Sequence, residues 1–169
     1  FLDKRVKVHN VDAKLFIENN DEKYDVIIVD FPDPADSVIS SLYTKELFSR
    51  LANLLSKNGM LVCQSSSPED TPQSYWSIAK TMRNAGLHTL PYNVIVPSFG
   101  LWGFHLAANQ KFTVNLTNIS VPYQALSKNL NSLFKIPSDI ISEKKNAIVN
   151  SIDKLKLHEV FQEEISSWY

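Results

Sequence analysis

Residues 24–36, YDVIIVDFPDPAD, join a strongly apolar run to an acidic, proline-rich turn. The consecutive Val and Ile residues are typical of a strand in a parallel sheet that is covered on both faces. Pro32 and Pro34 fix their own φ and restrict the residue before each of them to extended conformations. The stretch therefore predicts a central strand that ends in a stiff turn, where Asp30 and Asp33 are spaced D-x-x-D.

Helices and strands alternate after this turn. Residues 44–59, TKELFSRLANLLSKNG, have leucines at helical spacing, with Thr44 as the N-cap and Asn58-Gly59 as the stop. The apolar run MLVCQ at 60–64 predicts the next strand, and TPQSYWSIAKTMRNAG at 71–86 predicts a second helix. This βαβ order indicates an α/β fold with a doubly wound parallel sheet.

The flanking segments complete the predicted sheet. Residues 5–10, RVKVHN, alternate like a short strand, and AKLFIENN at 13–20 has helical spacing. The apolar segments 90–99 and 102–109 are too close for a crossover, so they predict an antiparallel hairpin. We expect one α/β domain over residues 1–110 and, over 111–169, a polar, helical C-terminal appendage with breaks at Pro122 and Pro137.

The composition limits the classes of partner. The 169 residues are 44% apolar and 21% charged, with a net charge of −1, which fits one packed domain. Because no basic patch is present, we expect no nucleic-acid partner. The single cysteine, Cys63, lies in an apolar run and indicates a core thiol in a reducing compartment. The four histidines show no metal-ligand spacing, so no metal site is predicted.

The acidic turn is the candidate site, because α/β sheets bind ligands at the carboxyl ends of parallel strands. Two carboxylates this close in sequence, Asp30 and Asp33, are unfavourable together unless a cation lies between them. A protonated amine or a metal ion would serve. The alternative is a solvated turn that caps the following helix.

A resemblance across nearly the whole chain bears on this choice. The segments VIIVDFPDP, LYTKELF, NGMLVCQSSSPEDTP, WSIAKTMRNAG and LPYNVIVPSFGLWGFHLA follow in the order and spacing of the spermidine synthase family, the polyamine aminopropyltransferases. The chain most resembles the bacterial branch with PSFG-x-WGF, whose members often carry an N-terminal membrane region. The match runs from about Val6 to Ala108, and FQEEISSWY resembles that branch's terminal helix.

The resemblance implies the C-terminal portion of a Rossmann-like, methyltransferase-type sheet, with the glycine-rich nucleoside loop upstream of Phe1. It also implies transfer of an aminopropyl group from decarboxylated S-adenosylmethionine to a diamine, without a cofactor. Asp30 matches the family's catalytic base, and Asp33 matches the acid that binds the substrate amine. The sulfonium supplies its own leaving group, so the reaction needs no metal.

Further positions carry over one by one. Asp12 matches an acid that binds adenine, although it would serve equally as a helix N-cap, and Gln64 matches a glutamine beside the diamine. Leu42 and Tyr43 match the family's loop that covers the nucleoside. Alternatively, they form a hydrophobic staple, an apolar contact that fixes the start of the helix after Thr44. Leu101 stands where relatives usually carry Glu or Gln, near the diamine pocket.

Two other functions remain open from sequence. A catalytically silent binding or assembly module would have kept the fold and lost the nucleoside site. A methyltransferase-like enzyme would use the same sheet for another transfer. The second acid, Asp33, favours a diamine acceptor over methyl transfer. We expect a cytoplasmic protein whose partners are a diamine and a nucleoside sulfonium. The strand 24–30, with an open edge, is expected to join two copies in a homodimer.

Overall fold

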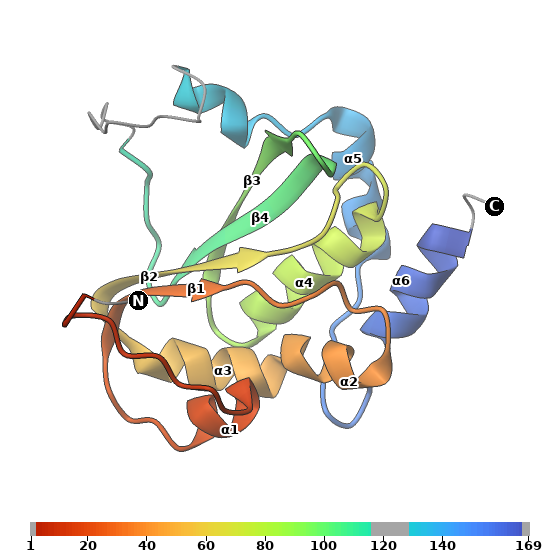
Figure 1. Cartoon of the computed structure of the whole chain (residues 1–169). Coiled ribbons are helices and arrows are strands. Elements are labelled where there is room, and N and C mark those ends of the chain that lie inside the picture. The colour runs from red at the N-terminus through yellow and green to blue at the C-terminus, as the bar shows by residue number, and fades with distance from the viewer. Residues whose placement is uncertain (1–2, 116–128, 167–169) are drawn as a thin grey trace.

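A four-stranded mixed sheet forms the centre of the computed structural model, which describes residues 3–115 and 129–166 (Figure 1). Its strands are β1 (Tyr24–Val29), β2 (Leu55–Gln64), β3 (His88–Val96) and β4 (Gly100–Ala108). Their order is β1-β2-β4-β3. β1 and β2 are parallel, whereas β4 is antiparallel to both β2 and β3. The predicted α/β fold and the closing hairpin are confirmed.

Short helices connect the strands and follow the hairpin. The α-helices are α1 (Ala13–Glu18), α2 (Ser37–Ser40), α3 (Lys45–Leu54), α4 (Pro72–Asn84), α5 (Ser138–Ser142) and α6 (Leu157–Ser166). The 3₁₀ helices are η1 (Ser41–Tyr43), η2 (Leu130–Phe134) and η3 (Glu143–Asn146). None of the helices in the two described ranges is long and apolar enough to cross a bilayer.

The helices α3 and α4 cover one face of the sheet. On that face Val29, Leu61 and Cys63 are buried, at 4%, 0% and 0% exposure. Side chains alternate along a strand, so Val26 and Ile28 point to the opposite face, where they are 63% and 72% exposed. The prediction of a strand covered on both faces is therefore wrong for the described part of the chain. An apolar run shows that a strand is hydrophobic, but it does not show that another helix or strand packs on its second face.

The start of α3 is as predicted, but its end is not. Thr44 caps the helix, since its Oγ1 accepts a hydrogen bond of 3.4 Å from Leu47 N. The helix ends at Leu54 rather than at Asn58-Gly59, because Leu55 is extended and pairs with Tyr24. A Cβ on Gly59 would lie 2.7 Å from the Tyr24 carbonyl oxygen. The Asn-Gly pair therefore belongs to an irregular part of β2.

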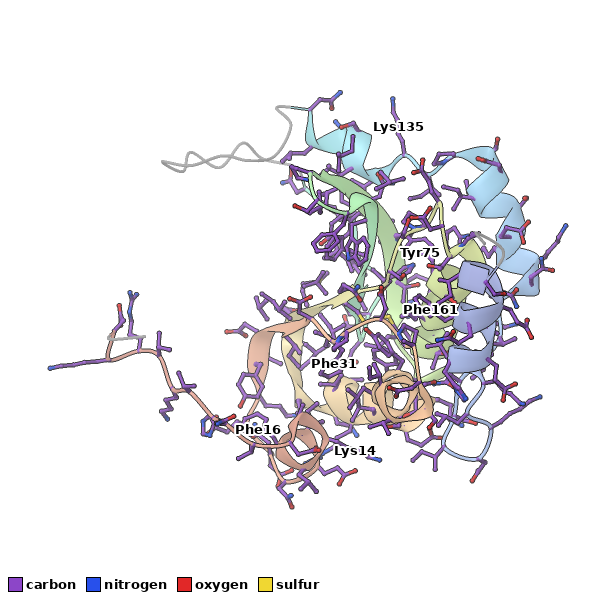
Figure 2. All side chains as sticks on the ribbon, turned by 45° about the vertical axis from the view of Figure 1, so that its right-hand side comes forward. Lys14, Phe16, Phe31, Tyr75, Lys135 and Phe161 are labelled. Carbon is purple, nitrogen blue, oxygen red and sulfur yellow. The ribbon has the colours of Figure 1, made fainter. Side chains whose placement is uncertain are left out.

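The predicted strand at residues 5–10 is also wrong. This segment has no strand structure, and Val6 and Val8 are 46% and 66% exposed. Figure 2 shows the chain before Phe16 leaving the body of the molecule. Its alternating pattern is not realised because no described strand lies beside it to complete a ladder. Within the described sheet β1 is accordingly an edge strand, as expected.

The C-terminal region contacts the sheet domain through η2, η3 and α6. η2 packs against β3, η3 against α4, and α6 against α2 and α4 (Figure 1). Two hydrogen bonds join α4 to this region: Trp76 Nε1 donates to the Ile140 carbonyl in α5 at 2.6 Å, and Ser74 Oγ donates to Glu164 Oε2 in α6 at 2.7 Å. Residues 116–128, which include the predicted break at Pro122, lie outside the described residues. The predicted division into 1–110 and 111–169 stays a prediction.

Candidate active site

The acidic turn follows β1 at the carboxyl edge of the sheet. Asp30 is exposed, and Asp33 is half-buried. The third acid, Asp36, caps α2 by accepting a hydrogen bond of 2.8 Å from Ile39 N. Because Asp36 meets the capping requirement of the next helix, capping does not explain the presence of Asp30 and Asp33.

Gln64 joins this turn from the neighbouring strand. Val29 pairs with Cys63 in the parallel ladder, so the next residues, Asp30 and Gln64, end their strands at the same edge. Gln64 is 7% exposed, and its Nε2 donates a hydrogen bond of 3.0 Å to Asp33 Oδ1. An ionised carboxylate can only accept, so this bond fixes the orientation of the Gln64 amide.

Tyr43 lies underneath the turn and is fully buried. Its hydroxyl lies 3.0 Å from the carbonyl oxygens of Phe31 and Pro32, and 3.2 Å from Gln64 Oε1. Burial, followed by the nearby Cys63, Asp33 and Asp30, raises the pKa of the Tyr43 phenol. Tyr43 is therefore a protonated donor at neutral pH.

The end of β2 is held by a second buried group. His105 Nδ1 and Ser65 Oγ are 2.9 Å apart, and Ser65 Oγ donates to the Cys63 carbonyl at 3.0 Å. Burial, followed by the charges of Arg83 and Lys144, lowers the pKa of His105 to about 3, so the imidazole is neutral. Burial also raises the pKa of the Cys63 thiol to about 12. Neither group is a nucleophile or a base at neutral pH.

The remaining predicted site residues lie around this cluster. Asp12 is exposed and caps α1, because its Oδ1 accepts a hydrogen bond of 3.0 Å from Leu15 N. Leu42 packs partly buried against the core. The structure thus brings Asp33, Gln64 and Tyr43 together with the turn that carries Asp30. The roles of Asp12 at adenine, and of Leu42 and Tyr43 at the nucleoside, stay predictions.

Two residues of the C-terminal region reach the site without having been predicted. Gln162 Nε2 donates a hydrogen bond of 2.7 Å to the Ala35 carbonyl, in the acidic turn. Asn150 Nδ2 donates to the carbonyls of Ser40 and Tyr43, at 2.8 and 3.2 Å. No local pattern marks them; the resemblance of FQEEISSWY to the family's terminal helix was the available signal for Gln162.

No metal site accompanies the acids in the part of the chain that the structure describes. Within residues 3–115 and 129–166, no group of three or more His, Cys, Asp and Glu residues is arranged to hold a metal ion. What the edge offers a ligand is a pair of carboxylates and a side-chain amide, which suit an amine.

Fold and site together define part of a Rossmann-like sheet with a pair of acids at its carboxyl edge. The sequence model of the spermine/spermidine synthase domain matches residues 1–118, and the chain belongs to this family. The resemblance noted from the sequence is thereby confirmed.

The relatives agree with this assignment. The chain is 44% identical over 170 residues to polyamine aminopropyltransferase 2 of Bacillus anthracis, covering 98% of this chain and 47% of that protein. It is 39% identical over 129 residues to polyamine aminopropyltransferase of Oceanobacillus iheyensis, covering 76% of this chain and 25% of that protein. The chain therefore spans about half the length, or less, of these curated relatives.

Solved structures share the fold. Spermidine synthase from Thermotoga maritima matches with a TM-score of 0.67 at 16% identity, over 85% of this chain and 51% of that one. A spermidine synthase in complex with the transition-state analogue AdoDATO matches with a TM-score of 0.66 at 18% identity, over 85% of this chain and 52% of that one. At these identities the likeness concerns the fold alone.

Proposed function

We propose that the protein containing this chain is a polyamine aminopropyltransferase. It transfers the aminopropyl group of decarboxylated S-adenosylmethionine to a diamine such as putrescine, which gives spermidine and methylthioadenosine. The observation that carries the proposal is the D-x-x-D turn at the end of β1, with Gln64 bound to its second acid. The names of the relatives support it, since they are polyamine aminopropyltransferases.

The chemistry requires two acids with different tasks. A diamine is protonated at neutral pH, so one amine must lose a proton before it can attack. Asp30, exposed at the edge, takes that proton, while the half-buried Asp33 holds the acceptor in line as an ionic partner.

The transfer step balances without any further reagent. The deprotonated amine attacks the aminopropyl carbon bonded to the sulfonium, a new C–N bond forms, and the C–S bond breaks with its electrons passing to sulfur. The neutral thioether, methylthioadenosine, leaves. Because the sulfonium is already an activated leaving group, the proposal includes no cofactor and no metal.

The test uses the full-length protein with decarboxylated S-adenosylmethionine and putrescine. We expect spermidine and methylthioadenosine to appear in equal amounts. Methylated product from S-adenosylmethionine would instead support the methyltransferase alternative. The absence of both turnover on any diamine and binding of the nucleoside would support the silent module, which has lost the nucleoside site.

Assembly and location belong to the same proposal. The open edge of β1 supports a homodimer in which two copies of this 169-residue chain pair along that edge, a form that sedimentation would detect. A stable monomer in sedimentation would contradict it.

We place the protein in the cytoplasm, where a buried free thiol such as Cys63 is usual. An N-terminal membrane region in the rest of the protein is compatible with this placement.

A further inference from the structure

We propose that Tyr43 is a positioning residue, whose buried hydroxyl sets the conformation of the acidic turn and, through Gln64, the direction of the Asp33 carboxylate. The inference rests on the proposed function, because the placement of these acids matters to turnover only if they bind and deprotonate the diamine. It assigns Tyr43 a task different from covering the nucleoside.

The backbone between the two acids lies against the Tyr43 hydroxyl. Phe31 and Pro32 are the two residues between Asp30 and Asp33, and both of their carbonyl oxygens lie 3.0 Å from the Tyr43 hydroxyl. The orientation of each carbonyl is set by the ψ angle of its residue, and the ring of Pro32 already fixes φ. One buried donor therefore restrains the torsions that determine how Asp30 and Asp33 lie relative to each other.

The side chain of Asp33 is linked to Tyr43 through Gln64. Its Oδ1 accepts from Gln64 Nε2 at 3.0 Å, and this bond turns Gln64 Oε1 towards Tyr43, 3.2 Å from the hydroxyl. The single hydroxyl proton is shared among Gln64 Oε1 and the carbonyl oxygens of Phe31 and Pro32. Removing the hydroxyl would leave these three acceptors without that donor. Buried acceptors without donors are costly, so the turn and the amide would move towards other partners.

Tyr43 is itself held in place by Phe31 and Asn150. Its ring is fully buried and lies edge-on to Phe31, with ring centroids 5.9 Å apart. Its backbone carbonyl accepts from Asn150 Nδ2, and Asn150 is also fully buried. Since Tyr43 is fixed from behind and has no exposed surface, it acts on the substrate only through the turn and Gln64.

Tyr75 provides a matched control. It is also fully buried, and its hydroxyl donates a single long hydrogen bond, 3.4 Å, to the Phe104 carbonyl. Tyr75→Phe and Tyr43→Phe each remove one buried phenol oxygen and leave the ring in place. A purely structural role for the two hydroxyls predicts similar kinetic behaviour of the variants, whereas positioning predicts that they differ.

The experiment is made in the full-length protein, with steady-state kinetics for putrescine and calorimetry for methylthioadenosine. For Tyr43→Phe we expect kcat/KM for the diamine to fall about 10- to 100-fold, as for a misplaced reacting group, with the nucleoside Kd unchanged. For Tyr75→Phe we expect both quantities to be unchanged. In an Asp33→Asn background, Tyr43→Phe should cause a smaller loss of kcat/KM than in the wild type, because one of the two acids that it orients is already altered.

Different results would refute the proposed function and the role of Tyr43. A wild-type protein without aminopropyl transfer would refute the proposed function. An active wild type with normal diamine kinetics in Tyr43→Phe, or a loss that is confined to the nucleoside Kd, would refute the role of Tyr43. If Tyr43→Phe does not fold, Asn150→Asp decides, because it removes the Nδ2 donor to the Tyr43 and Ser40 carbonyls and keeps the Oδ1 acceptor of Lys156 N and Leu157 N. That variant should lower diamine kcat/KM without changing the nucleoside Kd, and the opposite pattern would refute the role.

Discussion

Gln64, at the end of β2, donates a hydrogen bond of 3.0 Å from its Nε2 to Oδ1 of Asp33, in the turn after β1. The bond gives the two acids of the turn different surroundings: Asp33 is half-buried beside an amide donor, and Asp30 is exposed. An oriented carboxylate suits a fixed ionic anchor, whereas an exposed one suits proton transfer. The different roles proposed for Asp30 and Asp33 follow from this asymmetry.

Replacing Asp33 with Asn should chiefly weaken diamine binding. The substitution removes the charge that pairs with the acceptor, and the new amide faces the Gln64 donor instead of a carboxylate. We expect the diamine KM of the full-length protein to rise by roughly tenfold or more, as for the loss of a charge-assisted contact to the amine. Steady-state kinetics with putrescine measures this. An unchanged diamine KM would contradict the anchoring role.

Leu101 should influence the choice of amine. It lies in β4 next to the hairpin turn and pairs with Ile95. The resemblance to the family implies a polar residue at this position. An apolar side chain there favours a longer or less polar amine than putrescine, and Leu101→Gln should shift the preference back towards putrescine. Comparing kcat/KM over a series of diamines tests this. A strict putrescine preference in both proteins would show that position 101 has no such role.

Glu164 should stabilise the docking of α6 on α4. Its carboxylate accepts hydrogen bonds from Gln73 N and Ser74 N, at 2.6 and 3.0 Å, and so acts as the N-cap that Thr71 does not provide. We expect Glu164→Ala to lower the free energy of unfolding by about 1–2 kcal/mol, the usual effect of losing a cap. Denaturant unfolding measures this. The exposed Glu163→Ala is the control, and equal losses in both variants would contradict the capping role.

His105 should make stability fall in mild acid. Its pKa is about 3 in the folded protein and 6.5 when exposed, so between these values the unfolded chain binds a proton that the folded one does not. Stability is therefore retained above pH 6.5 and lost as the pH falls towards 3, by up to about 1.4 kcal/mol per pH unit. Unfolding at a series of pH values should show a shallower acid loss in His105→Gln. The exposed His88→Gln serves as the control, and the same acid loss in wild type and His105→Gln would exclude this effect.

Two helix starts and the closing hairpin could be predicted from local sequence. The starts of α3 and α4 follow from Thr44 and Pro72, and the hairpin follows from the short distance between two apolar segments. The strand predicted at residues 5–10 failed because a strand needs a partner, and alternation in one segment does not provide it. The end of α3 failed because the pairing of Leu55 with Tyr24 overrides helical spacing.

The site could be predicted only in part, for a related reason. Asp30, Asp33 and Gln64 follow directly on apolar strands, and parallel strands end at one edge, so their proximity is readable from sequence. The supporting contacts are not readable, because they join distant segments: Asn150 binds the carbonyls of Ser40 and Tyr43, more than a hundred residues earlier. Only folding brings such donors and acceptors together.

The central claim, that Asp30 is the base for aminopropyl transfer, is tested most directly by Asp30→Asn in the full-length protein. The amide keeps the shape of the side chain but cannot take a proton from the diamine. We predict that kcat for methylthioadenosine release falls by the ~10²–10⁴-fold typical of a lost general base. The nucleoside Kd, measured by calorimetry on the same preparation, should not change. Turnover within a few-fold of wild type would contradict the account.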